Sequence, residues 1–343
     1  MGEKKKVLII GGTGNISWPV AKQLADDPKV DLYLINLGKQ KDGLPEDVHR
    51  LTANIMTQAD YVKEKIADLV FDSVINFVIM TEDDARNSVD IFKDHTKQFI
   101  FISTVDVLDH RFECSVDETM ARGNQYYSYG QNKERAELYL LEEMKKGFPL
   151  TIVRPTQTYS KNRIPLSIKG KSCWSVVSRM LRGKEVIIHG DGQGVWASTH
   201  ANDFAPLFCP LVGEPKAVGE IFQVMNPEPM TWDMIYQNLA DLLGVEYKPI
   251  YISTYLLDES KVYGWKGSIH GDKHFSNIFD ISKVKRFNPS YEPKINIRTG
   301  LKMFLDYMEE HPESKVEDPQ FDEWCDKVID RYKECAKEFV EEI

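Results

Sequence analysis

Cysteine is scarce in this chain of 343 residues: only five occur, at widely separated positions. No two of them have the Cys-x-x-Cys spacing of a metal or redox motif, and an odd number does not suit a disulfide framework. We therefore expect no metal site and no disulfide bonds. Scattered cysteines of this kind favour a reducing, cytoplasmic environment.

Long apolar runs are also missing. No stretch of about 18 apolar residues occurs, so we expect no membrane span. Near the start, Lys4–Lys6 lead into only four strongly apolar residues before Gly11. Four residues are too few for the apolar part of a signal peptide. Internal repeats and low-complexity tracts do not occur either.

Basic residues are fewer than acidic ones: the chain has 43 Lys and Arg and 53 Asp and Glu, which gives a net charge of −10. A surface of this sign argues against broad binding of nucleic acids, whose phosphates need clustered lysines and arginines. Solubility is the simpler explanation of the acidic excess.

What the first part of the chain has is an alternation of short apolar runs and helical patterns, which is typical of a parallel sheet covered by helices. The runs that predict strands are Val7–Ile10, Asp31–Leu37, Ser73–Ile79, Gln98–Ser103 and Leu150–Arg154, and the helical patterns are Pro19–Asp26, Asp60–Leu69, Asp83–Lys93 and Tyr129–Lys146. We expect an α/β fold, with a Rossmann-type, doubly wound parallel sheet over residues 1–155.

After Pro155 the pattern changes to turn-rich pieces, interrupted by predicted helices at Ser175–Arg182, Trp232–Leu243 and Arg298–Tyr307. We expect residues 156–312 to form a smaller, mixed C-terminal domain that binds substrate. Residues 313–343 form an acidic tail. In Pro319–Ile343 the apolar residues Phe321, Trp324, Val328, Tyr332, Cys335 and Phe339 recur at steps of three and four. This pattern favours a helix docked on its own protein over a helix that binds a partner.

A glycine-rich turn, Gly11–Ser17, follows the first predicted strand and opens the first predicted helix. Gly11 permits a tight turn, and Gly14 lets the backbone approach a pyrophosphate without a Cβ in the way. The helix that follows offers free N–H groups and the positive end of its dipole to an anion. The turn therefore predicts a dinucleotide site, with contacts from Gly11, Thr13, Gly14, Asn15 and Ile16.

The end of the second predicted strand carries Asn36, where dinucleotide sites usually have an acidic residue. An amide hydrogen-bonds a ribose hydroxyl without repelling a 2′-phosphate, and Lys39 or Lys41 is available to pair with such a phosphate. These residues favour NAD and leave NADP open. Asn54 ends another predicted strand, and we expect it to reach the adenine edge.

Three further residues, Tyr129, Lys133 and Thr104, are candidates for a catalytic site that removes a hydroxyl proton. Tyr129 and Lys133 lie four residues apart at the start of a predicted helix, so both side chains share one face. A nearby ammonium and a positive nicotinamide ring both lower the pKa of a phenol, and Tyr129 is then able to remove a hydroxyl proton. Thr104 follows a predicted strand, at the sheet edge where ligands bind in open α/β sheets.

Together these pieces resemble the extended short-chain dehydrogenase/reductase family, in its nucleotide-sugar epimerase and dehydratase group. The matching segments also include Leu150–Pro155, Gly190–Gly192 and Thr199–Asp203. The resemblance implies a triad of Thr104, Tyr129 and Lys133, with Lys133 also holding the nicotinamide ribose. It implies a Rossmann domain with a smaller substrate domain, a sugar or nucleotide-sugar substrate, and a homodimer formed by helices of the first domain.

The chain departs from the group at several positions. Asn36 and Asn54 replace acidic residues, and Gly194–Ala197 lacks the arginine that contacts a substrate diphosphate in many members. The order Thr104-Val105-Asp106 provides one carboxylate where dehydratases have two, which disfavours a standard 4,6-dehydratase. Trp196 and the Thr199-His200 pair resemble an atypical subgroup that includes RNA-binding relatives.

We expect Asp106, Trp196 and His200 to contact substrate, and Arg154 to position either the strand end or an acidic neighbour. The polar cluster His270, Asp272, Lys273 and His274 is interpreted as a solvated loop rather than a metal site. The expected function is epimerisation of a sugar or nucleotide sugar by transient oxidation of a ring carbon. The alternatives are a net oxidoreductase or dehydratase acting on a sugar or glycoside, and a scaffold without catalysis that binds nucleotide or RNA.

Overall fold

The computed structural model describes residues 3–39, 42–265 and 267–343. Its centre is a seven-stranded sheet in which every neighbouring pair is parallel, in the order β12-β7-β5-β4-β1-β2-β3. The strands are β1 (Lys5–Ile10), β2 (Val30–Asn36), β3 (His49–Thr52), β4 (Ser73–Asn76), β5 (Phe99–Ile102), β7 (Leu150–Arg154) and β12 (Ile221–Gln223). The predicted doubly wound parallel sheet is confirmed.

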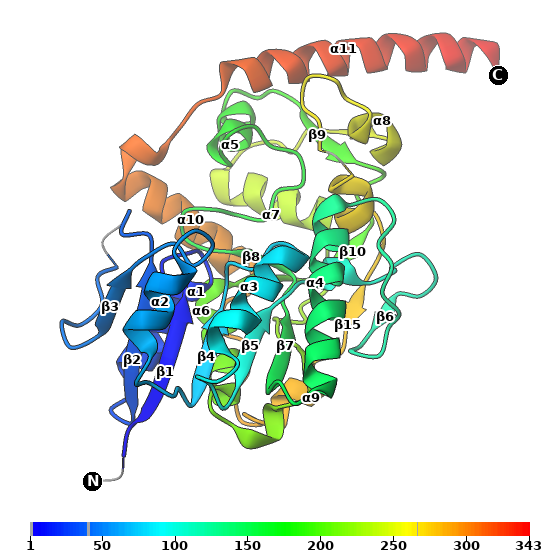
Figure 1. The fold of residues 1–343 in the computed structure, drawn as a ribbon. Coiled ribbons are helices and arrows are strands. Elements are labelled where there is room, and N and C mark those ends of the chain that lie inside the picture. The colour runs from blue at the N-terminus through cyan, green and yellow to red at the C-terminus, as the bar shows by residue number, and fades with distance from the viewer. Residues whose placement is uncertain (1–2, 40–41, 266) are drawn as a thin grey trace.

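Helices cover both faces of this sheet (Figure 1). One face carries α2 (Ala59–Ile66), α3 (Glu82–Phe92) and α4 (Ser128–Lys145), and the other carries α1 (Ser17–Ala25) and α6 (Ala201–Phe208). Side chains alternate along a strand, so Leu8 and Ile10 face the apolar cluster under α2, α3 and α4. Val7 and Ile9 face the cluster under α1 and α6. A strand buried on both faces must be apolar throughout, which explains the continuous run in β1.

Most of the rest of the chain forms short paired strands and helices beyond the carboxyl ends of the sheet strands, whereas α9 (Ser282–Lys285) packs against β12 and α6. The helices are α5 (Trp174–Leu181), α7 (Trp232–Leu243), α8 (Thr254–Asp258), α9 (Ser282–Lys285) and α10 (Ile297–Glu310). The strand pairs are β6 (Ser115–Val116) with β15 (Ile278–Phe279), β8 (Gln157–Tyr159) with β11 (Ser198–His200), β9 (Val186–His189) with β14 (Pro249–Ile252), and β10 (Val195–Trp196) with β13 (Met230–Thr231).

The two parts of the chain are more interwoven than a division near residue 155 implies. Strand β12 and helix α6 both follow that position, yet they complete the central sheet and its cover. In the other direction, β6 leaves the first part to pair with β15.

The tail forms one long helix, α11 (Pro319–Glu342). Its first half docks on the protein as expected, because Phe321, Trp324, Cys325 and Ile329 are buried. The second half does not: every residue from Asp330 to Ile343 is exposed, including Tyr332, Cys335 and Phe339. The apolar pattern predicted a docked face for the whole helix, and this was wrong for the part that extends beyond the protein body.

Within the described ranges, no helix combines the length and apolar character needed to cross a membrane.

Candidate functional site

The glycine-rich turn lines a cavity of about 360 Å³ at the carboxyl ends of β1 and β2, called here the glycine-loop cavity. Gly11 has φ +79°, and a Cβ there would lie 2.5 Å from Val78 Cγ1, so no other residue fits. Ser17 closes the turn: its hydroxyl donates to the Gly11 carbonyl at 2.6 Å and accepts from the Gly14 N–H at 2.8 Å. The first turn of α1 has no side-chain cap, which leaves its N–H groups for an anion.

The polar residues predicted to bind the cofactor lie around this cavity. Thr13, Gly14, Asn36, Lys39 and Asn54 line it, together with apolar side chains such as Ile35 and Met56. Asn36 has a second duty, since its Oδ1 accepts a hydrogen bond from the Gly12 N–H at 2.9 Å and steadies the turn. The alternative phosphate partner, Lys41, lies outside the described residues.

A second cavity, of about 480 Å³, continues from the first and shares Gly11, Gly14 and Val78 with it. We call it the Tyr129 cleft. The predicted residues that line it are Asn15, Ile16, Thr104, Asp106, Tyr129 and Lys133. Thr104 follows β5 and caps the short 3-10 turn Val105–Val107, while Tyr129 and Lys133 come from the first turns of α4.

Close packing brings these two elements together. A Cβ on Gly130 would lie 2.1 Å from the Asp106 carbonyl oxygen, so α4 approaches the Val105–Val107 turn as only glycine allows. The sequence therefore places the Tyr129 phenol near the Thr104 hydroxyl, in the same cleft.

Lys133 is buried against the strand ends. Its Nζ donates hydrogen bonds to the carbonyl oxygens of Ile79, at 2.5 Å, and Ile102, at 2.9 Å. Burial lowers the pKa of Lys133 to about 7, although the charge of Glu137 works in the opposite direction. The amine therefore titrates near neutral pH in the free protein.

The electrostatics of Tyr129 differ from the sequence-based expectation. Burial, followed by the negative charge of Asp106, raises the pKa of Tyr129 above its ordinary value, and the nearby Thr104 hydroxyl only partly offsets this. Lys133 Nζ lies 5.8 Å from the Tyr129 ring centre and is itself partly neutral. In the free protein Lys133 does not lower the pKa of the phenol, and the lowering expected with a bound nicotinamide stays a prediction.

The Tyr129 cleft also contains two residues that the sequence did not predict to be there, Asp272 and Lys273. They end the π-helical turn Ile269–Lys273 and form an ion pair with each other. The interpretation of this cluster as a solvated loop was wrong, because Asp272 is buried and its charge acts on the carboxyl group of Asp106. Burial, and then the charge of Asp272, hold the pKa of Asp106 well above its usual value.

Several contacts hold this segment in place. Asn124 Nδ2 donates to the Asp106 carbonyl at 2.8 Å and to the Gly271 carbonyl at 2.6 Å, so one side chain joins both segments. The Lys273 carbonyl accepts from Trp232 Nε1 at 3.0 Å and faces His189 Nε2 at 3.1 Å. The polar residues at 270–274 were visible in the sequence, but the partners named here lie about 40 to 170 positions away.

The other predicted substrate residues lie elsewhere. Trp196 is buried in the apolar core between the rings of His110 and Phe279 and does not line the Tyr129 cleft. His200 caps α6 through Nδ1, which accepts from the Asn202 N–H at 3.2 Å. It lies beside a neighbouring cavity of about 660 Å³. Arg154 pairs with buried Glu137 at 2.6 Å, which is one of its two expected roles.

Across the described ranges, no group of three or more His, Cys, Asp or Glu residues is arranged to hold a metal ion.

Comparison with known proteins identifies the family. The sequence model of the NAD dependent epimerase/dehydratase family matches residues 7–224. The chain belongs to this family. The match confirms the resemblance drawn from the motifs and the kind of cofactor expected, since NAD dependence defines the family.

Curated relatives of this epimerase/dehydratase chain include a trifunctional UDP-glucose 4,6-dehydratase/UDP-4-keto-6-deoxy-D-glucose 3,5-epimerase/UDP-4-keto-L-rhamnose-reductase of Arabidopsis thaliana. It is 22% identical over 306 residues, which cover 76% of this chain and 45% of that protein. The chain thus spans less than half the length of the curated relatives it matches.

Solved structures share the fold. A UDP-glucuronic acid 4-epimerase from Bacillus cereus has a TM-score of 0.69 at 18% identity, over 89% of this chain and 99% of that one. A UDP-glucose 4-epimerase from Thermotoga maritima has a TM-score of 0.68 at 20% identity, with the same coverage. A dTDP-glucose 4,6-dehydratase from Bacillus anthracis has a TM-score of 0.69 at 17% identity, over 90% of this chain and 98% of that one.

Proposed function

We propose that the protein is an NAD-dependent enzyme that oxidises and re-reduces a hydroxyl-bearing ring carbon of a sugar or nucleotide sugar, with epimerisation as the outcome. The observation that carries this proposal is the meeting of Thr104, Tyr129 and Lys133 in one cleft that continues from the glycine-loop cavity. Family membership supports it, as do related structures solved with NAD and a nucleotide sugar.

The residues around the glycine-loop cavity fit NAD. Apolar Ile35 and Met56 suit an adenine ring, Asn36 suits a ribose hydroxyl, and the uncapped start of α1 suits a pyrophosphate. When bound, NAD supplies a reversible acceptor of two electrons next to the substrate carbon. The amide of Asn36 and exposed Lys39 do not exclude the 2′-phosphate of NADP, so NAD is the preferred cofactor rather than a required one.

The residues of the Tyr129 cleft have separate duties. Thr104 donates a hydrogen bond to the substrate oxygen, and the Tyr129 phenol exchanges a proton with that same oxygen. Because burial and Asp106 raise the pKa of Tyr129, the phenol keeps its proton in the free protein. It acts as a base only when positive charge reaches the cleft, and Lys133 in its ammonium form contributes to that charge.

Replacing Tyr129 by phenylalanine tests the proposal. With UDP-glucose as the probe, we expect Tyr129→Phe to reduce turnover by about 100-fold or more, while NAD binding measured by calorimetry stays unchanged. Tyr139→Phe is the control, because Tyr139 lies on the same helix under the Arg86 guanidinium and away from the cleft. Full turnover by Tyr129→Phe would refute the mechanism, and absence of NAD binding by the unaltered protein would favour a scaffold.

Recognition of a nucleotide diphosphate needs a cation, and the usual arginine near Gly194–Ala197 is missing. Arg163 is available instead, since it lines both the Tyr129 cleft and the cavity beside His200. An exposed guanidinium at this junction suits a diphosphate. We therefore favour a nucleotide sugar over a free sugar. Arg163→Met should raise the KM for UDP-glucose more than it lowers kcat.

A second candidate, dehydration, is supported by the pair Asp106 and Asp272. The sequence alone provided one carboxylate here, but Asp272 brings a second from a distant segment. After a ring carbon is oxidised to a ketone, the ionised carboxylate can take a proton from the neighbouring carbon. The protonated partner gives its proton to the departing hydroxyl, which leaves as water, so the pair ends with as many protons as before.

Solvent deuterium separates the two candidates. A UDP-glucose product formed in D₂O carries deuterium on carbon if the carboxyl pair removes a carbon-bound proton. Simple epimerisation at the oxidised carbon leaves the product free of carbon-bound deuterium. If dehydration is right, Asp272→Asn should abolish deuterium incorporation and loss of water. Turnover without deuterium in the unaltered enzyme would eliminate dehydration and leave the main proposal intact.

A further inference from the structure

The cavity beside His200 has a volume of about 660 Å³ and is given no role by the reaction proposed above. Its walls come from the start of α1, the turn Ser160–Arg163, the start of α6 and Met303 of α10. It borders the other two cavities, because it shares part of the glycine-rich turn with both and Arg163 with the Tyr129 cleft. Its volume lies within the range of roughly 300–1,000 Å³ that is typical of small-molecule sites.

The charge of this cavity has one sign. Among the residues that the structure describes, its lining contains two cations, Lys161 and Arg163, and neither aspartate nor glutamate. Its other polar side chains are hydroxyl groups, amides and the His200 imidazole. The chain as a whole carries a net charge of −10, so a wall with positive charges alone differs from what its composition predicts. Such a wall attracts an anion.

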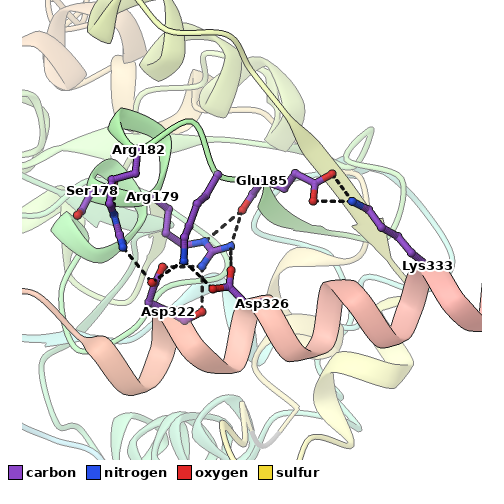
Figure 2. Close-up of polar contacts among 8 residues, drawn as sticks. Ser178, Arg179, Arg182, Glu185, Asp322, Asp326 and Lys333 are labelled. Atoms are coloured by element: carbon purple, nitrogen blue, oxygen red, sulfur yellow. Dashed lines mark hydrogen bonds and ion pairs between the residues drawn. The ribbon is translucent and has the colours of Figure 1, made fainter.

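Carboxylates neutralise basic side chains elsewhere in this protein. Figure 2 shows Arg179 of α5 between two carboxylates of α11, Asp322 at 2.5 Å and Asp326 at 2.9 Å. Lys161 has an aromatic neighbour instead, because its Nζ lies 5.0 Å from the centre of the Tyr307 ring. A ring face attracts the ammonium without cancelling its charge, so Lys161 stays available to an anionic ligand.

Both cations come from one tight turn. The Ser160 N–H donates to the Arg163 carbonyl at 2.9 Å and the Arg163 N–H donates to the Ser160 carbonyl at 3.0 Å, so only Lys161 and Asn162 lie between them. The Ser160 hydroxyl also donates to Asn162 Oδ1 at 2.7 Å. A turn closed by its own hydrogen bonds needs little ordering when a ligand binds, which favours binding.

Trp18 adds an aromatic surface to the same cavity. Its side chain is 40% exposed, and its Nε1 donates to the Asp42 carbonyl at 2.7 Å, which fixes the indole ring. Pro19 and Met303 provide apolar contacts nearby. A fixed, partly exposed indole beside two cations suits a ligand that joins a flat ring to a phosphate, since every nucleobase has a face that stacks on an aromatic side chain.

We propose that the cavity beside His200 binds a nucleoside phosphate other than the cofactor. The phosphate lies between Lys161 and Arg163, and the base stacks on Trp18. A phosphate monoester carries about two negative charges at neutral pH, which matches the two cations. This site goes beyond the proposed reaction, and its occupation does not depend on which sugar the Tyr129 cleft accepts.

Calorimetry with AMP as the probe tests the site on the full chain kept saturated with NAD. We expect AMP to bind, with a Kd that stays the same when the NAD concentration is raised about tenfold, because ligands at separate sites do not compete. An AMP Kd that rises in proportion to NAD would overturn the proposal, since AMP would then occupy the cofactor site. Absence of AMP binding to the NAD-saturated protein would overturn it as well.

Two variants test the contacts separately. Lys161→Met removes a cation that lines only this one of the three cavities, and it should raise the AMP Kd at least about tenfold. Lys171→Met is the matched control, because Lys171 is exposed and lies outside the cavity lining. Trp18→Ala should weaken AMP binding at least about fivefold and leave the binding of inorganic phosphate unchanged. An AMP affinity in Lys161→Met equal to that of the unaltered protein would contradict the site, and this variant changes only an exposed side chain.

Discussion

Replacing Glu137 by glutamine removes the negative charge that fixes α4 to the sheet. Glu137 is completely buried and accepts hydrogen bonds from Arg154 Nε at 2.9 Å, Arg154 Nη2 at 2.6 Å and Arg122 Nε at 2.7 Å. Arg154 is equally buried, and its Nη1 already has no hydrogen-bond partner. The glutamine amide keeps one acceptor oxygen but cannot balance the guanidinium charge.

The size of the effect follows from that burial. Leaving one charge of a buried pair uncompensated costs about 3–5 kcal/mol, so Glu137→Gln should reduce the free energy of unfolding by this amount. Urea denaturation followed by tryptophan fluorescence measures it at neutral pH. Glu142→Gln is the matched control on the same helix, because its pair with Lys145 is exposed and should contribute less than about 1 kcal/mol.

The pH dependence provides an independent check. Burial alone would raise the pKa of Glu137, but the hydrogen bonds and charge of Arg154 outweigh it and hold the pKa below its usual value. A carboxyl group with a lowered pKa in the folded state stabilises the protein above the unfolded value of about 4.3. This stabilisation disappears as the pH falls through the folded pKa, so the two proteins should converge in strong acid. A loss below 1 kcal/mol at neutral pH would refute the reasoning.

Three further changes test the site. Gly11→Ala should weaken NAD binding at least about tenfold by calorimetry, because the added Cβ would meet Val78. Gly43→Ala is the control and should leave NAD binding unchanged, because Gly43 also has a positive φ but has open space around it. Asn124→Ala should lower turnover while NAD binding is kept, since it releases the Gly271 segment from Asp106; equal losses of both would contradict this. The pKa of Lys133 near 7 lies below its unfolded value, so the unfolded state holds the extra proton above pH 7. Unfolding free energy should therefore rise from pH 7 to 9 by about 2 kcal/mol more in the unaltered protein than in Lys133→Met, and equal slopes would show that Lys133 stays charged.

Local sequence patterns were enough to predict the fold and to pick out most of the polar residues that line the two cavities. The run before Gly11 and the spacing of Tyr129 and Lys133 depend only on neighbouring residues, and α4 begins within one residue of its predicted start. The helix Trp232–Leu243 was predicted with its observed bounds because Thr231 caps one end and Gly244 the other.

Contacts between distant segments could not be predicted in this way. Asp272 follows Asp106 by more than 160 positions, and no local pattern predicts that Asn124 joins the two segments. Trp196 was expected at the substrate because of its neighbours in sequence, but packing decided its place in the core. The pKa of Tyr129 depends on burial, which one sequence does not specify.

The late position of Asp272 and Lys273 also sets an order of assembly on the ribosome. The glycine-loop cavity is lined only by residues between Ile10 and Val78, all of which leave the exit tunnel early. The Tyr129 cleft stays incomplete until the segment ending at Lys273 has been synthesised and has closed its long-range contacts. In a nascent chain, every residue that lines the nucleotide pocket is therefore synthesised before the residues that complete the catalytic cleft.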